Sequence, residues 1–546
     1  MSNSRVLEII RLYGAAEAEE ANYKTMCQDI ANLCFPRENQ IVTVTSPGTD
    51  RSGPIYDPTA IMAKDDMATG LSSVLFPFGQ HFHDIKMARR DDNDDEQVKR
   101  GLGIINEITH EKRAVSNFLV EAGETLKSIA CFGTGNLFSR FVPGTGLNYR
   151  DWDIGQYVII ENNLGIIDGV MMVLRWTAQQ AYDEWGDTIG VTPMKALSSA
   201  KPEDAIKKFK FIVSIMPRKT RNRRLSNVTN MPWAYEVVNV DDKVLVSESG
   251  FEEFPHFVSR WSKSSNETWG RGQGVTALPA MRRLQQIYSD FLECGEKWNN
   301  PPREVQNDFE GTVRVGPGAN NWVNQVGTIK AIDQGMRGNF PYTVEVLGME
   351  RQIIKELFLN DLFMPITPLK GDRRNQMEIS ERITESLKRI GSPVNRLQEE
   401  WIKPQVSRDI KLLWRNGAFN GIPGLDRIAG QEFKITLLGP VAMQLKNWQA
   451  QGALNWMAQG AELKQSFPGI DDNIDVDSAF RRVGESYGVA TEDMATTDDV
   501  NQRREVRAQQ VAQEQAMKMA EMAGKAYPGT TKAPEAGSPA EALVGA

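Results

Sequence analysis

The chain has 546 residues, of which 40% are hydrophobic and 25% charged, as in an ordinary globular protein. Its length exceeds the size at which one hydrophobic core keeps growing, so we expect about three to five sub-domains. The 63 basic and 71 acidic residues leave a net charge of −8, which argues against a protein that grips duplex nucleic acid tightly through its phosphates.

Membrane and secreted classes are also disfavoured. No run of about 18 apolar residues is present, so we expect no membrane span. The N-terminus lacks the apolar core of a signal peptide. Four scattered cysteines, Cys27, Cys34, Cys131 and Cys294, are too few for a disulfide framework or a zinc site, which favours a reducing cytoplasm during assembly. Cys27 and Cys34 lie on an expected helix and are interpreted as small core residues.

The first part of the chain is expected to be mainly helical. An amphipathic helix covers residues 6–33, and a polar loop follows over 37–54. Asp57 is placed to cap a helix that runs to about residue 74. Another long helix is predicted from about residue 96 to 131.

Strands follow these helices. Residues 157–161 and 165–173 predict a hairpin that turns at Asn162 and Asn163. Further strands are predicted over 209–216, 233–240 and 243–247. The body that precedes residue 276 is therefore expected to be α+β.

The segment from residue 276 to 363 is the most informative. A helix over 276–298 carries apolar residues at steps of three and four, and Pro301 and Pro302 end it. A second helix carries Val346, Met349, Ile353, Leu357 and Phe358 on one face. The insert between them, 303–342, is rich in Gly and Asn with short Val/Ile runs and predicts a small β or α/β tip. Such a stalk with a tip suits contact rather than chemistry.

The remainder is again mainly helical. After a breaker-rich loop over 364–372, a helix begins near residue 375 and is interrupted at 391–393. Ser392 is expected to cap its continuation to about residue 416, with a bend at Pro404. A returning strand is predicted over 433–438, helices over 441–494, and a long polar helix over 499–526. The Pro/Gly/Ala-rich residues 527–546 are expected to be disordered.

The usual catalytic motifs are missing from the sequence. There is no phosphate-binding loop of the Gly-x-x-x-x-Gly-Lys-Ser/Thr type. Gly270, Gly272 and Gly274 precede a helix but lack the strand of a dinucleotide fold, so a tight turn explains them better. His81 and His83 have no neighbouring third histidine or carboxylate pair in the sequence and are interpreted as structural or surface residues.

One acidic segment has the alternating spacing that opens a calcium loop: Asp471, Asn473, Asp475 and Asp477. The sixth position is Val476 rather than Gly, and the twelfth is Arg482 rather than Glu, so a solvated loop is the better interpretation. We therefore predict no catalytic residue, metal or cofactor.

Several separated motifs resemble the portal protein, or head-to-tail connector, of short-tailed, T7-like bacteriophages. In chain order they are Asp57-Pro58-Thr59, Leu71-Ser72-Ser73-Val74-Leu75-Phe76-Pro77, Phe132-Gly133-Thr134-Gly135-Asn136-Leu137, Trp269-Gly270-Arg271-Gly272, Asn300-Pro301-Pro302, Val315-Gly316-Pro317-Gly318, Gly391-Ser392-Pro393 and Leu412-Leu413-Trp414-Arg415. Each motif alone is weak, and their order together with the stalk carries the resemblance. It covers almost the whole chain.

The resemblance implies a mainly helical α+β portal fold that assembles, normally as twelve copies, into a ring around a central channel. The regions it implies are a wing (1–275), a first stem helix (276–298), a clip (299–345), a second stem helix (346–363), a tunnel loop (364–374), a second wing segment with the kinked helix (375–440), a crown (441–494), a C-terminal helical barrel (495–526) and a disordered tail (527–546).

The implied function is a passive conduit at one vertex of the virion capsid, assembled in the host cytoplasm. Double-stranded DNA would pass through the ring during packaging and ejection, driven by the ATPase of the terminase. The implied partners are the terminase, a tail adaptor protein, the major capsid protein and a scaffolding protein, with no membrane. A weakly acidic channel wall repels phosphates and suits transport better than gripping.

Two basic clusters are candidate sites. Lys370, Arg373 and Arg374 fall in the loop that the resemblance identifies as the tunnel loop, where they would touch passing DNA weakly. The second cluster comprises Arg218, Lys219, Arg221, Arg223 and Arg224. A solvated loop that pairs with acidic residues of a neighbouring subunit is favoured for it over phosphate contact.

Two alternatives stay open at this point. The first is a metal-dependent DNA-processing enzyme of a phage, whose acidic residues would converge from separate segments. The second is another oligomeric structural protein of the virion, such as an adaptor or internal scaffold, although the stalk and tip speak against it.

Overall fold

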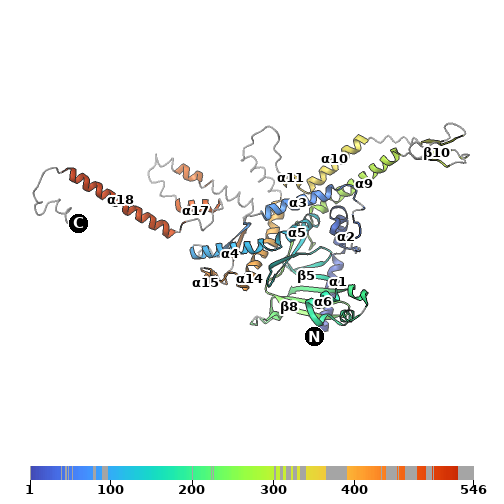
Figure 1. Cartoon of the computed structure of the whole chain (residues 1–546), viewed down its shortest axis with the longest axis horizontal. Helices are drawn as coiled ribbons and strands as arrows, with labels where there is room; N and C mark the ends of the chain where they lie inside the picture. Colours follow the sequence, from blue (N-terminus) through green and yellow to red (C-terminus); the bar gives the residue numbers. More distant parts are fainter. Residues whose placement is uncertain are drawn as a thin grey trace, which may run out of the picture. The chain divides into compact units, whose positions relative to one another are not determined.

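A computed structural model of the chain is drawn in Figure 1. The structure describes residues 2–77, 81–88, 96–299, 340–363, 390–437, 476–486 and 497–526, apart from single positions and pairs inside these ranges, together with short pieces of 303–331 and 452–460. By its internal contacts the chain divides into two units, one of residues 1–88 and 101–445, the other of residues 89–100 and 446–546.

The first unit contains a five-stranded antiparallel sheet in which each strand pairs with the next along the chain. The predicted hairpin and the three further predicted strands are confirmed. At the predicted turn, Asn162 Oδ1 accepts the amide N–H groups of Leu164 and Ile166 at 2.9 and 3.1 Å. The strands are β4 (Tyr157–Glu161), β5 (Ile167–Thr177), β6 (Lys208–Pro217), β7 (Trp233–Asn239) and β8 (Val244–Phe251).

Helix α1 (Ser2–Glu19) packs against this sheet. Its buried residues Val6, Ile9 and Tyr13 share one core with residues of four strands, namely Val158, Met171, Ile212 and Val238. Full burial of such a side chain stabilises by roughly 1.5–3 kcal/mol, so this face fixes the helix on the sheet. The connection from β5 to β6 consists of α6 (Ala178–Trp185), the 3-10 turn η3 (Gly186–Ile189), α7 (Val191–Leu197) and α8 (Pro202–Ile206).

The helix predicted over 6–33 is divided in two at Glu20. Helix α2 (Ala21–Cys34) starts there, followed by the 3-10 turn η1 (Pro36–Glu38). The reason is a tertiary contact: the buried Glu20 carboxylate accepts the backbone N–H of Ile159 at the edge of the sheet, with Oε1 at 3.3 Å. Its Oε2 has no hydrogen bond but lies 3.7 Å from the Nζ of Lys24. Burial outweighs this charge and raises the pKa of Glu20 to about 7.

The helix predicted over 96–131 is also divided, into α4 (Glu96–Ala114) and α5 (Phe118–Phe132). Between them, Asn117 bonds to the backbone of Tyr149 in both directions, at 2.7 and 2.9 Å. A side chain engaged in this way with a strand explains why the α-helix does not continue through the sequence at this point. The predicted helix that ends near residue 74 is confirmed as α3 (Thr59–Leu75).

A second sheet, with the order β3-β2-β9, was missed by the sequence analysis. It consists of β2 (Thr134–Val142), β3 (Gly146–Asp151) and β9 (His256–Arg260). Its central strand buries polar residues, Thr134, Asn136 and Ser139, which hide the apolar alternation of a strand. Each has a partner: Asn136 Oδ1 lies 2.8 Å from His256 Nδ1, Thr134 Oγ1 accepts the N–H of Gly270 at 2.9 Å, and Ser139 Oγ accepts from Arg408 at 3.1 Å. The Nδ2 of Asn136 is buried without a hydrogen bond.

The strand predicted over 433–438 is confirmed as β12 (Phe433–Leu437), which pairs with β1 (His83–Met87). Beside this ribbon, Arg113 of α4 and Asp409 of α14 (Lys403–Arg415) form a fully buried ion pair, with Nη2 2.9 Å from Oδ2. Tyr149 donates to the same carboxylate oxygen at 2.7 Å. The network joins two helices and a strand, and removal of either charge would leave the other buried without its partner.

The helix predicted after residue 391 consists of α13 (Gly391–Leu397), the π turn η5 (Gln398–Ile402) and α14 (Lys403–Arg415), followed by α15 (Leu425–Ile428). The predicted cap at Ser392 is wrong, because Ile390 takes the N-cap position and no side chain caps the helix. The π turn directly precedes Pro404, where the bend was predicted. The helical start near residue 375 lies outside the described residues.

In the second unit, α18 (Thr497–Ala526) confirms the long polar helix predicted over 499–526. Helix α17 (Val476–Ser486) precedes it, and Asp477 pairs with Arg504 of α18 at 2.6 Å. Asp477, considered above for calcium, thus has a cationic partner, while residues 471, 473 and 475 lie outside the described residues. None of the helices in the described ranges combines the length and the hydropathy of a membrane span.

The Glu20 carboxyl predicts a pH dependence of stability. Because burial raises its folded-state pKa from the usual value near 4.5 to about 7, its stabilising contribution is complete below pH 4.5 and is lost as pH rises through 7. The Glu20→Gln variant has no carboxyl at this position, so its free energy of unfolding should not fall over this pH range. We expect the difference between the variant and the wild type to change by roughly 2–3 kcal/mol in favour of the variant from pH 4.5 to pH 7.5. Urea unfolding at several pH values measures this. The exposed Glu203→Gln should keep the wild-type pH profile, and equal slopes for all three proteins would contradict the prediction.

Candidate docking stalk and its base

Two long helices, α9 (Gln273–Asn299) and α10 (Phe340–Leu357), run side by side in the first unit and are called the stalk below (Figure 1). They confirm the helices predicted over 276–298 and 346–363, except that α10 gives way at Leu359, where φ is 59°, to the short helix α11 (Asn360–Phe363). Arg283 of α9 and Glu350 of α10 pair across them at 3.1 Å.

Apolar residues of the stalk become exposed along α9. Leu278, Met281 and Leu284, near the base, are buried. Farther along the same helix, Leu292 is 43% and Trp298 64% exposed. The rest of the chain thus covers this apolar stripe at its base but not at its far end.

The apolar stripe predicted for the second stalk helix is wrong in part. Met349 and Ile353, placed on its packing face, are exposed. The buried residues of α10 are instead Leu347 and Ile354. Because α10 carries apolar residues on two faces, periodicity alone did not determine which one packs within the chain.

The tip of the stalk contains a short antiparallel ribbon, β10 (Arg303–Val305) with β11 (Ile329–Ala331) (Figure 1). This agrees with the predicted β tip, and residues 313 and 314 lie outside its two strands. Asn321 bonds to the backbone of Arg314 through both of its amide atoms, at 2.7 and 2.9 Å. Trp322 beside it is 88% exposed.

The base of the stalk rests on backbone-to-backbone packing of four glycines, Gly133, Gly270, Gly272 and Gly274, which we call the glycine junction. Gly133 ends α5 with φ of 87°, a conformation that favours glycine. A Cβ on Gly272 would lie 2.5 Å from the Gly133 nitrogen and 2.7 Å from the Ile129 oxygen. A Cβ on Gly274 would meet the backbone carbonyl of Cys131. The glycines thus allow close chain approach within the protein, which agrees with the structural interpretation rather than with nucleotide binding.

Hydrogen bonds surround the glycine junction. Tyr23 of α2 donates its hydroxyl to the carbonyl oxygens of Phe132 and Gly270, at 2.9 and 3.0 Å. Its ring stacks on Trp269 with centroids 5.0 Å apart. Phe132-Gly133 and Trp269-Gly270, which belong to two separate sequence motifs, are therefore neighbours in the fold and form one contact.

A second attachment holds the stalk helices to the body through Asp57, which is 1% exposed. Gln285 of α9 accepts the N–H of Tyr56 and Asp57 at 2.7 and 3.0 Å and donates to the Asp57 carbonyl at 2.8 Å. Arg351 of α10 donates to Asp57 Oδ2 at 2.8 Å. Pro58, not Asp57, is the N-cap of α3, but Asp57 Oδ1 accepts the N–H of Thr59 at 2.8 Å. One residue thus positions three helices.

The predicted basic residues are placed only in part. Arg218 is paired within the chain, with Nη1 2.9 Å from Glu248 Oε1 and Nη2 3.1 Å from the Ser249 carbonyl. Lys219, Arg221 and Arg224 are exposed in the loop between β6 and β7. Arg223 lies outside the described residues, as do Lys370, Arg373 and Arg374.

The histidines form a cluster that the sequence analysis did not foresee. His110 of α4 stacks on His81, with ring centroids 4.3 Å apart and 18° between the planes, so a third histidine does lie near His81 and His83. His83 Nε2 lies 2.7 Å from Arg113, and burial lowers the pKa of His83 well below its usual value. Near-parallel rings do not direct their nitrogens at a common ion. Within the described parts of the chain, no group of three or more His, Cys, Asp or Glu residues has the arrangement of a metal site.

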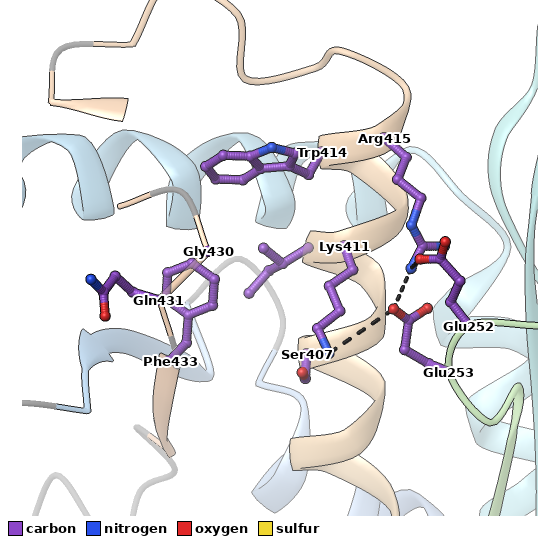
Figure 2. Close-up of a pocket in the computed structure, with 10 residues that line it drawn as sticks. Glu252, Glu253, Ser407, Lys411, Trp414, Arg415, Gly430, Gln431 and Phe433 are labelled. Atoms are coloured by element: carbon purple, nitrogen blue, oxygen red, sulfur yellow. Dashed lines mark hydrogen bonds and ion pairs between the residues drawn. The ribbon is translucent and has the colours of Figure 1, made fainter. Parts of the chain in front are cut away.

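A surface hollow of about 520 Å³ lies between α14 and the segment before β12 (Figure 2). Its cationic side chains point at carboxylates of the loop after β8: Arg415 lies 3.0 Å from Glu252, and Lys411 lies 4.0 Å from Glu253. Trp414 and Phe433 line the other side (Figure 2). Because these charges are matched within the chain, the hollow has the character of a contact between elements rather than of an anion site.

Comparison with known proteins agrees with a connecting role. Residues 7–494 match the family described as "Bacteriophage head to tail connecting protein", so the chain belongs to this family. It is 22% identical over 533 residues to the portal protein of Salmonella phage epsilon15, covering 96% of this chain and 95% of that protein. It is 21% identical over 412 residues to the probable portal protein of Bordetella phage BPP-1, covering 73% and 72%. The resemblance read from the motifs is confirmed.

The glycine junction predicts that two glycine-to-alanine substitutions near α9 have opposite effects. Gly272→Ala would push a methyl group into the backbone of α5, and we expect it to lower the free energy of unfolding by about 3 kcal/mol or more. Gly295→Ala, inside α9 with no atom near its added methyl, should gain about 0.5–1 kcal/mol. Chemical denaturation measures both, and a neutral Gly272→Ala would contradict the close packing.

Proposed function

We propose that the protein is a phage portal that assembles as a ring, normally of twelve copies, at one capsid vertex and acts as the conduit for DNA packaging and ejection. The family match over residues 7–494 carries this proposal, and both relatives are portal or probable portal proteins. The role is structural: the ring guides DNA, while a separate terminase supplies the driving force.

The exposed apolar residues of the stalk support ring assembly. Leu292 and Trp298 on α9, with Met349 and Ile353 on α10, remain between 38% and 64% exposed after the two helices have packed together. A neighbouring copy that presents its own stalk would bury them, with a gain of roughly 25 cal/mol for each Å² of apolar surface removed from water. In this arrangement the stalk helices of neighbouring copies pack side by side and form a tube around the channel.

The regions of the proposed ring follow from the stalk. Residues 276–298 and 346–363 would form the stem, residues 299–345 the clip, residues 364–374 the tunnel loop, and residues 1–275 with 375–440 the wing. The clip would dock the terminase during packaging and a tail adaptor protein afterwards. Residues 441–494 and 495–526 would form the crown and barrel, and the major capsid and scaffolding proteins would contact the ring during assembly in the host cytoplasm.

Two groups of cations have proposed roles in this ring. Lys370, Arg373 and Arg374 would touch the phosphates of DNA in the channel. Lys219, Arg221 and Arg224, exposed in the β6–β7 loop, would contact acidic residues of a neighbouring subunit or phosphates. Arg218 contributes less to either contact, because Glu248 already pairs with it.

Ring formation predicts that charges on the outer stalk face prevent assembly. We expect Met349→Glu combined with Ile353→Glu to leave the fold intact, because both side chains are exposed, but to abolish rings under conditions where the wild type forms them. Light scattering and electron microscopy measure the particle mass and the central hole. Val191→Glu with Ile206→Glu, two exposed residues outside the stalk, is the matched control. Rings in the stalk variant, or a wild type that stays monomeric, would contradict the proposal.

The tunnel-loop role predicts a defect in DNA retention. Replacing Lys370, Arg373 and Arg374 by glutamine should leave ring assembly unchanged and lower the fraction of heads that keep their DNA, because weak phosphate contacts are lost. Replacing the exposed Lys195, Lys201 and Lys208 by glutamine changes the net charge equally and should have no effect. Full DNA retention after deletion of residues 370–374 would exclude this role.

A further inference from the structure

Two buried thiols meet directly beneath the glycine junction. Cys34 ends α2 and Cys131 is the penultimate residue of α5, and their Sγ atoms are 3.2 Å apart. Both side chains are fully buried. The residues that follow the two cysteines, Phe35 and Phe132, stack with ring centroids 6.3 Å apart, so a second contact holds the same two helix ends together.

The other cysteines have no comparable neighbour. Cys27 lies two helical turns before Cys34, about 10 Å along the axis of α2, which is too far for the two sulfurs to meet. Cys294 is exposed on the stalk. The arrangement thus selects one pair out of the four cysteines, which sequence spacing could not do because the two partners are 97 residues apart.

The surroundings of the pair favour slow rather than fast thiol chemistry. Burial raises the pKa of the Cys131 thiol well above its usual value, while the positive charge of Lys64 acts in the opposite direction. Lys64 is itself only 3% exposed, and its Nζ lies 4.0 Å from the centre of the Phe35 ring. Large thiol reagents have no access to sulfurs that are fully buried, whereas a small oxidant can reach them during local opening.

We propose that Cys34 and Cys131 are a modification site: they form a disulfide when the protein leaves reducing surroundings, and this bond locks α2 to α5 beneath the stalk. The sulfurs need to approach by roughly 1 Å, because a disulfide bond is about 2 Å long. With hydrogen peroxide as oxidant, one thiol loses its proton and the resulting thiolate attacks a peroxide oxygen, which breaks the O–O bond. This step gives a sulfenic acid and a hydroxide, and the hydroxide takes up the proton to become water. The second sulfur attacks the sulfenic sulfur and releases another water, so the two sulfurs lose the two electrons that the peroxide gains.

The position of the bond gives it a consequence for the stalk. Helices α2 and α5 both pack against α9, and Gly274 in the first turn of α9 lies on the backbone of Cys131. A covalent link there joins the two surfaces that support the stalk. It also closes a long loop, which restricts the unfolded chain and so favours the folded one. The pairing rests on geometry alone; its timing, after release of the particle from the host cytoplasm, rests on the proposed function.

The test uses the full chain, purified with a reductant and then exposed to dilute hydrogen peroxide or kept reduced. We use Cys294→Ala as the background, since this exposed thiol would otherwise form links between chains. The expected result is a loss of the mass of two hydrogen atoms, one peptide pair joined through Cys34 and Cys131 in a non-reducing digest, and a melting midpoint that rises by several degrees and returns on reduction. Cys27→Ala should keep the link, and Cys34→Ala should lose it.

Two results would overturn the inference. In the first, Cys34 and Cys131 are still recovered as thiols after an exposure to peroxide many times longer than the exposed Cys294 of the wild type needs, or one of them is found joined to Cys27. In the second, the link forms but the melting midpoint is unchanged or lower, which excludes a locking role. Both readouts come from the purified chain whether or not it forms rings, so their failure is distinct from failure of the proposed function.

Discussion

The contact that sets the base of the stalk is mainly between backbone atoms. At the glycine junction the backbone of residues 270–274 lies against the end of α5, with Gly133 in a left-handed conformation between them. Side chains can change rotamer to relieve a poor fit, but two backbones in contact have no such freedom. The backbone contact therefore sets the direction in which α9 leaves the body. Tyr23 donates hydrogen bonds to both backbone segments of this contact, at Phe132 and at Gly270.

The Asp57 cluster supports the stalk by different chemistry. Gln285 and Arg351, one from each stalk helix, meet the same buried residue through a neutral amide and through a charge. Elsewhere in the unit the Arg113–Asp409 pair ties α4 to α14 in the same manner. Buried charges of this kind specify which elements meet more than they add stability, since burying each charge costs nearly as much as their attraction returns. The buried contacts of the stalk are thus concentrated at its base, whereas apolar residues farther along it are exposed.

Sequence reasoning succeeded where local pattern and tertiary role agree. The β4–β7 strands are short runs rich in Val, Ile and aromatic residues, which favour strands locally, and Asn162 marks their first turn. It failed where long-range contacts determine the structure. The buried polar residues Asn136 and Ser139 hide the pattern of β2, and the contact of Glu20 with Ile159 divides a helix whose periodicity is continuous. Helix α10 has two apolar faces, and the local sequence does not show which of them is buried. The sequence indicated a tight turn at Gly272, but it did not indicate that this turn contacts Gly133, which is distant in the chain. Likewise, only the fold brings His110 to His81.

Because of the π turn Gln398–Ile402, the fold depends on the number of residues in this helical segment. A π turn accommodates one residue more than the α turn it replaces, so every side chain after it is rotated by about 100° relative to an uninterrupted α-helix. Arg408 and Asp409 face their buried partners, Ser139 and Arg113, only with that rotation included. A change of chain length at this turn would therefore misdirect a whole helix face, whereas the same change in a surface loop would be absorbed locally.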